Sequence, residues 1–390
     1  MKEKVIRSKR KKRLNVPNLI TCIVFFAIII SIPIITAILP KEDFSEMENT
    51  SLKKMPKISA KTVFNRSYMN DLEKYISDHF AGRVGWIKGR TVLETSLGKQ
   101  ERNGIYILEN RLVEKISEPD YSAVDKSIAA INTFAEKNDV PIFFMLVPTS
   151  ADIYADELPK NAPNVNQKEF ISYVCGSLNK PVTSIDVYQT MYSNRDDYIY
   201  YRTDHHWTTK GAYLAYAAAG KKMGYTAERE DMYDIEHAGI DFIGTFYSKA
   251  LYDGVDKDIL DFYHFTLGDN VTEVLVTTEY GKEPRSYNSM YFREYLDVKD
   301  KYSSFLGTNA PLVTIKADNS GGKLLIIKDS YAHCYSTFLT QHYSEITLMD
   351  MRYINMSYKE LIDPEEYDQV LFLYNASSFM SDIDIKKLAY

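Results

Sequence analysis

The chain has 390 residues, 45% of them hydrophobic and 26% charged, which is ordinary for a folded protein with a sizeable core. Residues 1–18 hold eight Lys and Arg side chains and one acid, and the remainder carries 39 basic and 52 acidic residues, a net charge of −13. So acidic a surface argues against nucleic acid, and against broad adhesion to anionic lipid, as the partner.

An uncharged segment, residues 19–39, follows the basic tail. Its 21 residues span a hydrocarbon core of about 30 Å. Because basic flanks stay in the cytoplasm, we predict a cytoplasmic tail (1–18), a transmembrane anchor (19–39) and an extracytoplasmic remainder. A cleaved signal peptide is the alternative. Its apolar region is normally about 7–15 residues long, and TAILP is a poor cleavage site.

Residues 40–115 are predicted to form a juxtamembrane linker and a lead-in of helices and a hairpin. Apolar residues recur at helical spacing over 65–97, which predicts two helices broken at Gly82. The segment NGIYILENRLVEK, residues 103–115, predicts a β-hairpin around ENR.

Helical and apolar strand patterns alternate over 116–390, which predicts an α/β domain with a central parallel sheet. Runs such as PIFFMLVP are typical of strands buried on both faces. Residues 227–318 have little helical period, and we expect a β-leaning insertion there. The expected helices are 121–140, 167–178, 332–343 and a short one at 357–366, and the expected strands are 141–148, 181–188, 322–330, 344–353 and 367–379.

Two residue types are informative by their number. There are 31 tyrosines, which either pack in the interior or line a sugar-binding surface. There are three cysteines, so at most one bridge can form outside the membrane segment, between Cys175 and Cys334. No Cys/His spacing indicates a zinc site.

Three expected strands end in polar residues, at Ser330, Arg352 and Asn375. Ligands of parallel sheets bind at the carboxyl ends of the strands, so these residues could meet at one edge. The segment TDHHW, residues 203–207, lies some 15 residues after another strand, and its loop could reach the same edge.

These residue types suit nucleophilic catalysis. A serine hydroxyl needs a base to take its proton, and an imidazole held by a carboxylate is such a base. Asp204 and His206 are two positions apart, so they project to one side of an extended segment, and His205 points away. An oxyanion would be stabilised by the backbone N–H of Ser330 and by side chains such as Asn375 or Arg352.

Each candidate also has a purely structural interpretation. The cluster of Asp204, His205 and His206 could bind a metal ion, although no fourth ligand follows at a typical spacing. Taken singly, the side chains could serve as a helix N-cap (Ser330), a loop-stabilising group (His206), a turn residue (Asn375), an ion-pair partner of Asp350 or Asp329 (Arg352) and an interior packing residue (Trp207).

The segments TDHHW and IIKDSYA, with YISDHFAGR, NGIYI and FMLVPTSADIY, resemble the DHHW family of bacterial proteins. The chain is also similar to the SGNH-type domain of the alginate O-acetylation proteins. The resemblance implies a three-layer SGNH-like α/β domain whose parallel sheet has a permuted strand order. It departs from the SGNH pattern at Lys328, which stands in place of the glycine of Gly-Asp-Ser, at the Asp-x-His spacing, and at Arg352.

By the same resemblance, Ser330 is the nucleophile, His206 the base, Asp204 its orienter, and Asn375 the residue after the third strand. The implied function is a membrane-anchored extracytoplasmic O-acetyltransferase that modifies a cell-surface polysaccharide through a serine acyl-enzyme, without metal or cofactor. The implied partner is a multi-spanning membrane acyltransferase that supplies acetyl groups, and the implied location is the bacterial cell membrane. Two further hypotheses stay open, a carbohydrate esterase that removes acetyl groups and a non-catalytic glycan-binding or scaffold protein.

Overall fold

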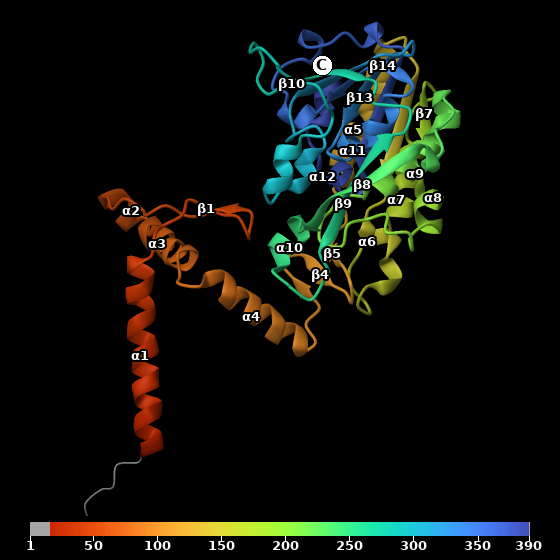
Figure 1. The fold of residues 1–390 in the computed structure, drawn as a ribbon. Helices are drawn as coiled ribbons and strands as arrows, with labels where there is room; N and C mark the ends of the chain where they lie inside the picture. The colour runs from red at the N-terminus through yellow and green to blue at the C-terminus, as the bar shows by residue number, and fades with distance from the viewer. Residues whose placement is uncertain (1–15, 390) are drawn as a thin grey trace, which may run out of the picture. The chain divides into compact units, whose positions relative to one another are not determined.

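The structure is a computed structural model that describes residues 16–389 (Figure 1). Most of the basic tail predicted over 1–18 lies outside the described residues. The chain divides into two compact units, residues 1–90 and 91–390. The boundaries predicted for the linker, the catalytic domain and its insertion stay predictions.

The first unit contains one helix, α1 (Val16–Ile38), that is long and apolar enough to cross a membrane. None of its side chains is buried within the protein, so it is not a core helix. At Gly82 the backbone adopts a φ of +69°, which only glycine adopts at little cost, and the predicted break between two helices is confirmed there. The remaining elements are β1 (Phe44–Ser45), β2 (Thr50–Ser51), α2 (Ala60–Phe64), α3 (Ser67–Asp78) and the start of α4 (Arg83–Ser96).

The second unit opens with a small antiparallel sheet. The predicted hairpin is confirmed as β4 (Ile105–Ile107) and β5 (Leu112–Glu114), and β3 (Glu101–Arg102) adds a third strand.

A central eight-stranded sheet follows, in the order β11-β10-β12-β14-β13-β15-β6-β7. The five strands from β14 to β7 are mutually parallel, whereas the pairs β14–β12, β12–β10 and β10–β11 are antiparallel. The strands are β6 (Ile142–Val147), β7 (Val182–Ile185), β10 (Val271–Thr277), β11 (Arg285–Tyr287), β12 (Leu312–Ala317), β13 (Gly322–Lys328), β14 (Tyr343–Met349) and β15 (Gln369–Asn375).

Helices cover both faces of this sheet, and the predicted α/β fold with its parallel centre is confirmed. Because strand side chains alternate, Phe144 packs in one core and Met145 in the other. One face carries α5 (Tyr121–Lys137), α7 (Gln167–Gly176) and α12 (Ala376–Ser381), and the other carries α9 (Thr209–Met223) and α11 (Tyr331–Leu339).

Several predicted elements end earlier than expected. The strand expected over 367–379 stops at Asn375, because this residue caps α12 with its side chain. The strand expected over 181–188 stops at Ile185, and α8 (Tyr188–Ser193) follows. The helix expected over 357–366 is two short 3-10 turns, Tyr358–Glu360 and Pro364–Glu366. Asp363 interrupts the helix, because a residue before proline is driven out of the helical region.

Residues 227–318 are β-rich, as expected. The strands β8 (Tyr233–Phe242) and β9 (Asp258–Phe265) pair with each other, and α10 (Thr245–Ala250) lies between them in the chain. The strands β10, β11 and β12 instead extend the central sheet, so part of this segment belongs to the sheet itself.

Many of the tyrosines pack in the interior. Several of the largest fully buried side chains are tyrosines, namely Tyr200, Tyr201, Tyr216, Tyr331, Tyr335, Tyr358 and Tyr374.

The disulfide bridge that the sequence allowed is not present. Cys175 and Cys334 are both free thiols, so no bridge joins them.

Candidate active site

The TDHHW segment lies in a loop whose backbone donates hydrogen bonds to a buried carboxyl group. Asp258, at the start of β9, is fully buried. It accepts hydrogen bonds from the backbone N–H groups of Arg202 (2.7 Å) and Thr203 (2.8 Å), and from the hydroxyls of Thr203 (2.5 Å) and Tyr198 (2.7 Å). Burial raises the pKa of Asp258, and these four donors oppose that shift because they stabilise the ionised form. Together they fix the position of the loop.

Asp204 is held in the same way from a distant segment. Its Oδ2 accepts from the backbone N–H (2.7 Å) and hydroxyl (3.1 Å) of Thr245, at the start of α10. Gly244 makes this approach possible, because a Cβ there would lie 2.2 Å from Asp204 Oδ2. The carboxylate is therefore oriented before any substrate binds.

Asp204, His206 and Ser330 form a hydrogen-bonded line. His206 Nδ1 lies 2.5 Å from Asp204 Oδ1, and His206 Nε2 lies 2.7 Å from Ser330 Oγ. A carboxylate only accepts, so Nδ1 carries the proton, and Nε2 of the neutral ring is free to accept the Ser330 proton. The second distance is within the 2.6–3.2 Å range, roughly, that proton transfer needs. The structure thus brings together three of the residues singled out from the sequence.

The pKa values suit a base and its orienter. Burial, with the neighbouring charge of His205, lowers the pKa of His206 to about 4, so its imidazole is neutral near pH 7. Burial alone would raise the pKa of Asp204, but the two neighbouring histidines hold it well below its usual range. Asp204 is therefore ionised when His206 is ready to accept a proton.

Ser330 lies between the end of β13 and the start of α11. Its side chain makes no capping hydrogen bond, so the structure does not use it as a side-chain N-cap. Among residues 16–389, nothing accepts a hydrogen bond from its backbone N–H. An unpaired N–H at a helix N-terminus is a donor of the kind that stabilises an oxyanion.

Asn375 also lies near Ser330, but its side-chain amide is already in use. Its Nδ2 donates to Asp329 Oδ2 (2.7 Å) and to Ser378 Oγ (2.8 Å), and its Oδ1 accepts from the backbone N–H of Ser378. The geometry gives it the roles of helix cap and support for Asp329, the neighbour of Ser330. Its assignment as an oxyanion donor stays a prediction.

Arg352 makes a bidentate ion pair with Asp350, at 2.8 and 2.6 Å, which is one of the two roles expected for it. Its side chain is 31% exposed, and its charge acts on both His206 and Asp329. A role in binding the oxyanion or the substrate stays a prediction.

Lys328, which replaces the glycine of the SGNH pattern, is fully buried beneath the same edge of the sheet. Its Nζ lies 3.3 Å from Asp350 Oδ2 and 2.7 Å from His333 Nε2. His333 Nδ1 in turn lies 3.1 Å from the carbonyl oxygen of Phe305. Burial lowers the pKa of Lys328 and holds the pKa of His333 well below its usual range.

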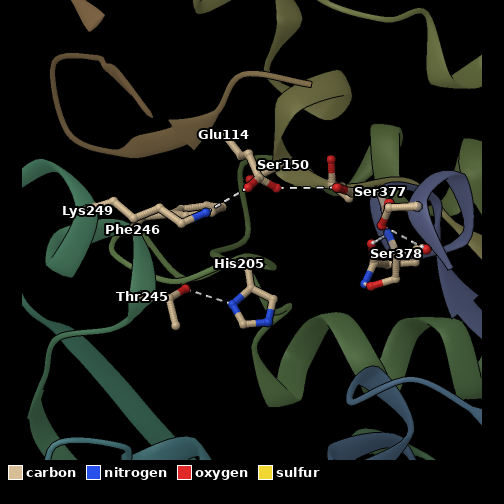
Figure 2. A pocket seen from close by; sticks show the side chains of 11 residues that line it. Glu114, Ser150, His205, Thr245, Phe246, Lys249, Ser377 and Ser378 are labelled. Carbon is tan, nitrogen blue, oxygen red and sulfur yellow. Dashed lines mark hydrogen bonds and ion pairs between the residues drawn. The ribbon is translucent and has the colours of Figure 1, made fainter. Parts of the chain in front are cut away.

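His205 was predicted to point away from Asp204 and His206, and this prediction was wrong. The segment is not extended, because the backbone N–H of His206 donates to Asp204 Oδ1 and closes a turn. The rings of His205 and His206 therefore lie side by side, with centroids 3.8 Å apart. His205 Nδ1 lies 2.8 Å from Thr245 Oγ1 (Figure 2). It also lies 3.3 Å from Asp204 Oδ1.

Trp207 is a packing residue, in keeping with its structural interpretation. It is fully buried, and its ring lies 4.8 Å, between centroids, from that of Tyr331. Its Nε1 donates to the Tyr331 carbonyl at 3.3 Å. This contact ties the TDHHW loop to α11 one residue after Ser330.

The cluster of Asp204, His205 and His206 offers ligand atoms within 4.8 Å of one another, close enough for a metal ion. However, Nδ1 of both histidines faces Asp204, and Nε2 of His206 faces Ser330. The histidine nitrogens in these contacts could also bind a metal ion, but here they are placed for proton transfer. The absence of a metal from the mechanism stays a prediction.

Three residues of the site carry no motif and were missed from the sequence. They are Asp258, which holds the loop, Thr245, which holds Asp204, and Tyr302, whose ring stacks on His206. All three lie in the 227–318 segment, whose β-leaning pattern says nothing about contacts with TDHHW.

Comparisons with known proteins agree with this fold. Residues 94–349 match the family described as DHHW protein. A DHHW family protein from Eubacterium siraeum DSM 15702 is 25% identical, with a TM-score of 0.63 over 74% of this chain and 95% of that chain. No curated protein matches the chain.

A second protein, Bacillus cereus PatB1, has a similar structure. It is 22% identical, with a TM-score of 0.62 over 72% of this chain and 98% of that chain. A structure of PatB1 with a sulfonyl adduct is 20% identical, with a TM-score of 0.59 over 70% of this chain and 96% of that chain. These likenesses bear on the fold.

Proposed function

The chain belongs to the DHHW family, and we propose that it is an SGNH-type serine acyltransferase that moves acetyl groups onto hydroxyls of a cell-surface polysaccharide. The observation that carries this proposal is the hydrogen-bonded line from Asp204 through His206 to Ser330. A structural serine has no need of a buried neutral imidazole within hydrogen-bond distance. The acetyl group and the polysaccharide come from the resemblance to the alginate O-acetylation proteins.

The first half-reaction acetylates the enzyme. Ser330 Oγ bonds to the acetyl carbonyl carbon of the donor as its proton passes to His206 Nε2. The Ser330 backbone N–H, which has no acceptor among the described residues, stabilises the negative oxygen that develops. The intermediate then collapses, the donor's leaving group takes the proton from His206, and acetyl-Ser330 remains.

The second half-reaction transfers the acetyl group. The acceptor hydroxyl gives its proton to His206 Nε2 as its oxygen bonds to the acetyl carbon. The bond from that carbon to Ser330 Oγ breaks, and Ser330 takes the proton back from His206. Water in place of the acceptor would make the same centre an esterase.

The apolar helix α1 supports a place at the membrane. Its 23 residues are about 35 Å long, enough for a hydrocarbon core of about 30 Å. Since none of its side chains is buried in the protein, the helix needs another apolar environment. An uncleaved anchor would hold the domain on the outer surface, where a membrane-embedded acetyl donor and the polysaccharide meet.

Turnover of p-nitrophenyl acetate by the full chain in detergent micelles tests the enzyme. We expect Ser330→Ala and His206→Ala each to lower kcat by about 10⁴- to 10⁶-fold. Ser336→Ala is the matched control, because this buried serine of α11 donates only to the Ala332 carbonyl. Turnover that survives in Ser330→Ala would contradict the proposal and favour a binding or scaffold protein. Addition of glycan then shows whether acetyl goes to sugar or to water.

A further inference from the structure

A cavity of about 270 Å³ lies next to the TDHHW loop, and Figure 2 shows side chains that line it. Two residues that line this cavity connect it to the site. One is His205, which is next to His206 in the chain, and the other is Asn375, which donates a hydrogen bond to Asp329, the neighbour of Ser330. Its volume is just below the range of about 300–1,000 Å³ that drug-sized ligands occupy. A single sugar ring is a ligand of about the right size.

The walls of this cavity are polar. Ten of the eleven side chains that line it carry a polar group, and Phe246 is the exception. Ser150 follows the carboxyl end of β6 and is 3% exposed, yet its hydroxyl has no hydrogen-bond partner within the described part of the chain. A hydroxyl that lines a cavity without a protein partner can form a hydrogen bond with a ligand.

Two side chains of opposite charge in the cavity wall, Glu114 and Lys249, form an ion pair. Lys249 Nζ lies 3.0 Å from Glu114 Oε1, and Glu114 Oε2 accepts from Ser377 Oγ at 3.3 Å (Figure 2). A charged ligand would have to compete with this ion pair, whereas a neutral ligand with many hydroxyls can bond to both partners. The chemistry of the wall therefore favours an uncharged, hydroxyl-rich ligand.

His205 links the cavity to the triad. Its Nδ1 faces Thr245 and Asp204, which leaves Nε2 to form a hydrogen bond with a ligand hydroxyl, as acceptor in the neutral ring and as donor in the charged ring. No group in the described residues bonds to Nε2, and 35% of the side chain is exposed. A hydroxyl bonded there belongs to a ligand that lies beside the His206 base.

Resting on the proposed acetyl transfer, we propose that this cavity is the acceptor subsite, where His205 Nε2 and the Glu114–Lys249 pair hold one uncharged sugar ring. A hydroxyl of that ring would then reach His206 and acetyl-Ser330. The ring gives its proton to His206 Nε2 and gains the acetyl group, and Ser330 is restored with that proton.

The test separates acetylation of the enzyme from transfer to the acceptor. The full chain is mixed with p-nitrophenyl acetate, and the burst of p-nitrophenol gives the acetylation rate. Methyl glucoside is then added as acceptor, with methyl glucuronide as its charged counterpart, and acetylated sugar is measured. The variants are His205→Gln and Lys249→Ala. Lys316→Ala is the matched control, because it breaks a 3.0 Å pair of similar exposure, with Glu273, elsewhere on the domain.

In each cavity variant, we expect the KM for methyl glucoside to rise. The fold-increase in this KM should be roughly ten times the fold-change in the acetylation rate. Lys316→Ala should change neither, and methyl glucuronide should be the poorer acceptor. An unchanged KM in both cavity variants, or a preference for the glucuronide, would overturn the subsite while a normal burst upheld the proposed function. The absence of any burst from the wild type would overturn both. Should His205→Gln fail to fold, the exposed Lys249→Ala still decides.

Discussion

Tyr302 stacks on His206, with ring centroids 3.5 Å apart and an angle of 8° between the planes. The Tyr302 hydroxyl also donates to the backbone carbonyl of Ser330 at 3.2 Å. One buried tyrosine thus contacts both His206, the proposed base, and the segment that carries Ser330, the proposed nucleophile. Because a neutral imidazole is oriented by its neighbours, we assign Tyr302 a positioning role.

Replacing Tyr302 with Leu removes the stack and the hydrogen bond, so the His206 ring gains freedom to tilt away from Ser330. We expect kcat for p-nitrophenyl acetate to fall by about tenfold to a hundredfold. Tyr302→Phe keeps the stack and should lose less.

Tyr291→Leu is the control, because Tyr291 also stacks, on Phe262 at 4.1 Å, and donates to a backbone carbonyl. It should lower thermal stability without lowering kcat. Equal losses of kcat in the two Leu variants would contradict a positioning role for Tyr302.

Gly244 allows the carboxylate of Asp204 to approach the start of α10. Its φ of −94° is open to any residue, so Ala would act through contact alone. The new Cβ would lie 2.2 Å from Asp204 Oδ2, and the carboxylate would have to move. We expect Gly244→Ala to cost about 1–3 kcal/mol in the free energy of unfolding and to lower kcat.

Gly176→Ala provides the comparison, because a Cβ there meets nothing within 4 Å. Urea unfolding and ester turnover, measured on both variants, decide the matter. Wild-type kcat in Gly244→Ala would show that the Asp204 position is not critical.

The buried charges below the site should respond unequally to substitution. Asp350→Ala leaves buried Lys328 and half-buried Arg352 without their counter-charge, which we expect to cost about 3–5 kcal/mol of unfolding free energy. Lys328→Met leaves Asp350 still paired with Arg352, so its cost should be smaller. Urea unfolding of the two variants checks this order, and the reverse order would refute the account of the network.

Activity should persist to low pH. His206 accepts a proton only when neutral, and its pKa lies at about 4, below the usual value of 6.5. Activity is therefore lost as the pH falls through about 4. The acid limb of the pH profile of kcat/KM for p-nitrophenyl acetate should lie well below pH 6.5. As the pH falls, His206 is protonated in the unfolded chain before it is protonated in the folded chain. The folded state therefore also loses stability as the pH falls from 6.5 to about 4.

The charge of His205 contributes to the low pKa of His206, so His205→Gln should move the acid limb upward. Lys316→Ala should leave it in place. A wild-type limb at or above pH 6.5 would contradict the assignment of His206 as the buried base.

The contact of Asp204, His206 and Ser330 could be predicted because these residues stand at a strand end or in a distinctive motif. Ser330 follows an apolar strand, and the carboxyl ends of parallel strands share one edge, so the partner of TDHHW could be inferred. The geometry now places His206 Nε2 within hydrogen-bond distance of Ser330 Oγ, across 124 positions of sequence.

The rest of the site depends on contacts that no local pattern records. Thr245 reaches Asp204 across 41 positions, and Tyr302 is one of 31 tyrosines. His205 was misplaced because the alternation rule assumes an extended backbone, whereas the side chain of Asp204 closes a turn there. In the fold, helix and strand types were predictable from period, but the end of β15 was not, since Asn375 belongs to strand and helix cap alike.

The most direct test of the central claim is the mass of the enzyme during turnover. The full chain is mixed with p-nitrophenyl acetate, quenched with acid within the burst and digested, and the peptide that contains Ser330 is sequenced by mass spectrometry. We predict one acetyl group on Ser330 in the wild type and none on this peptide in His206→Ala. A wild type that turns over the ester with Ser330 unmodified, or with acetyl on another side chain, would contradict the account.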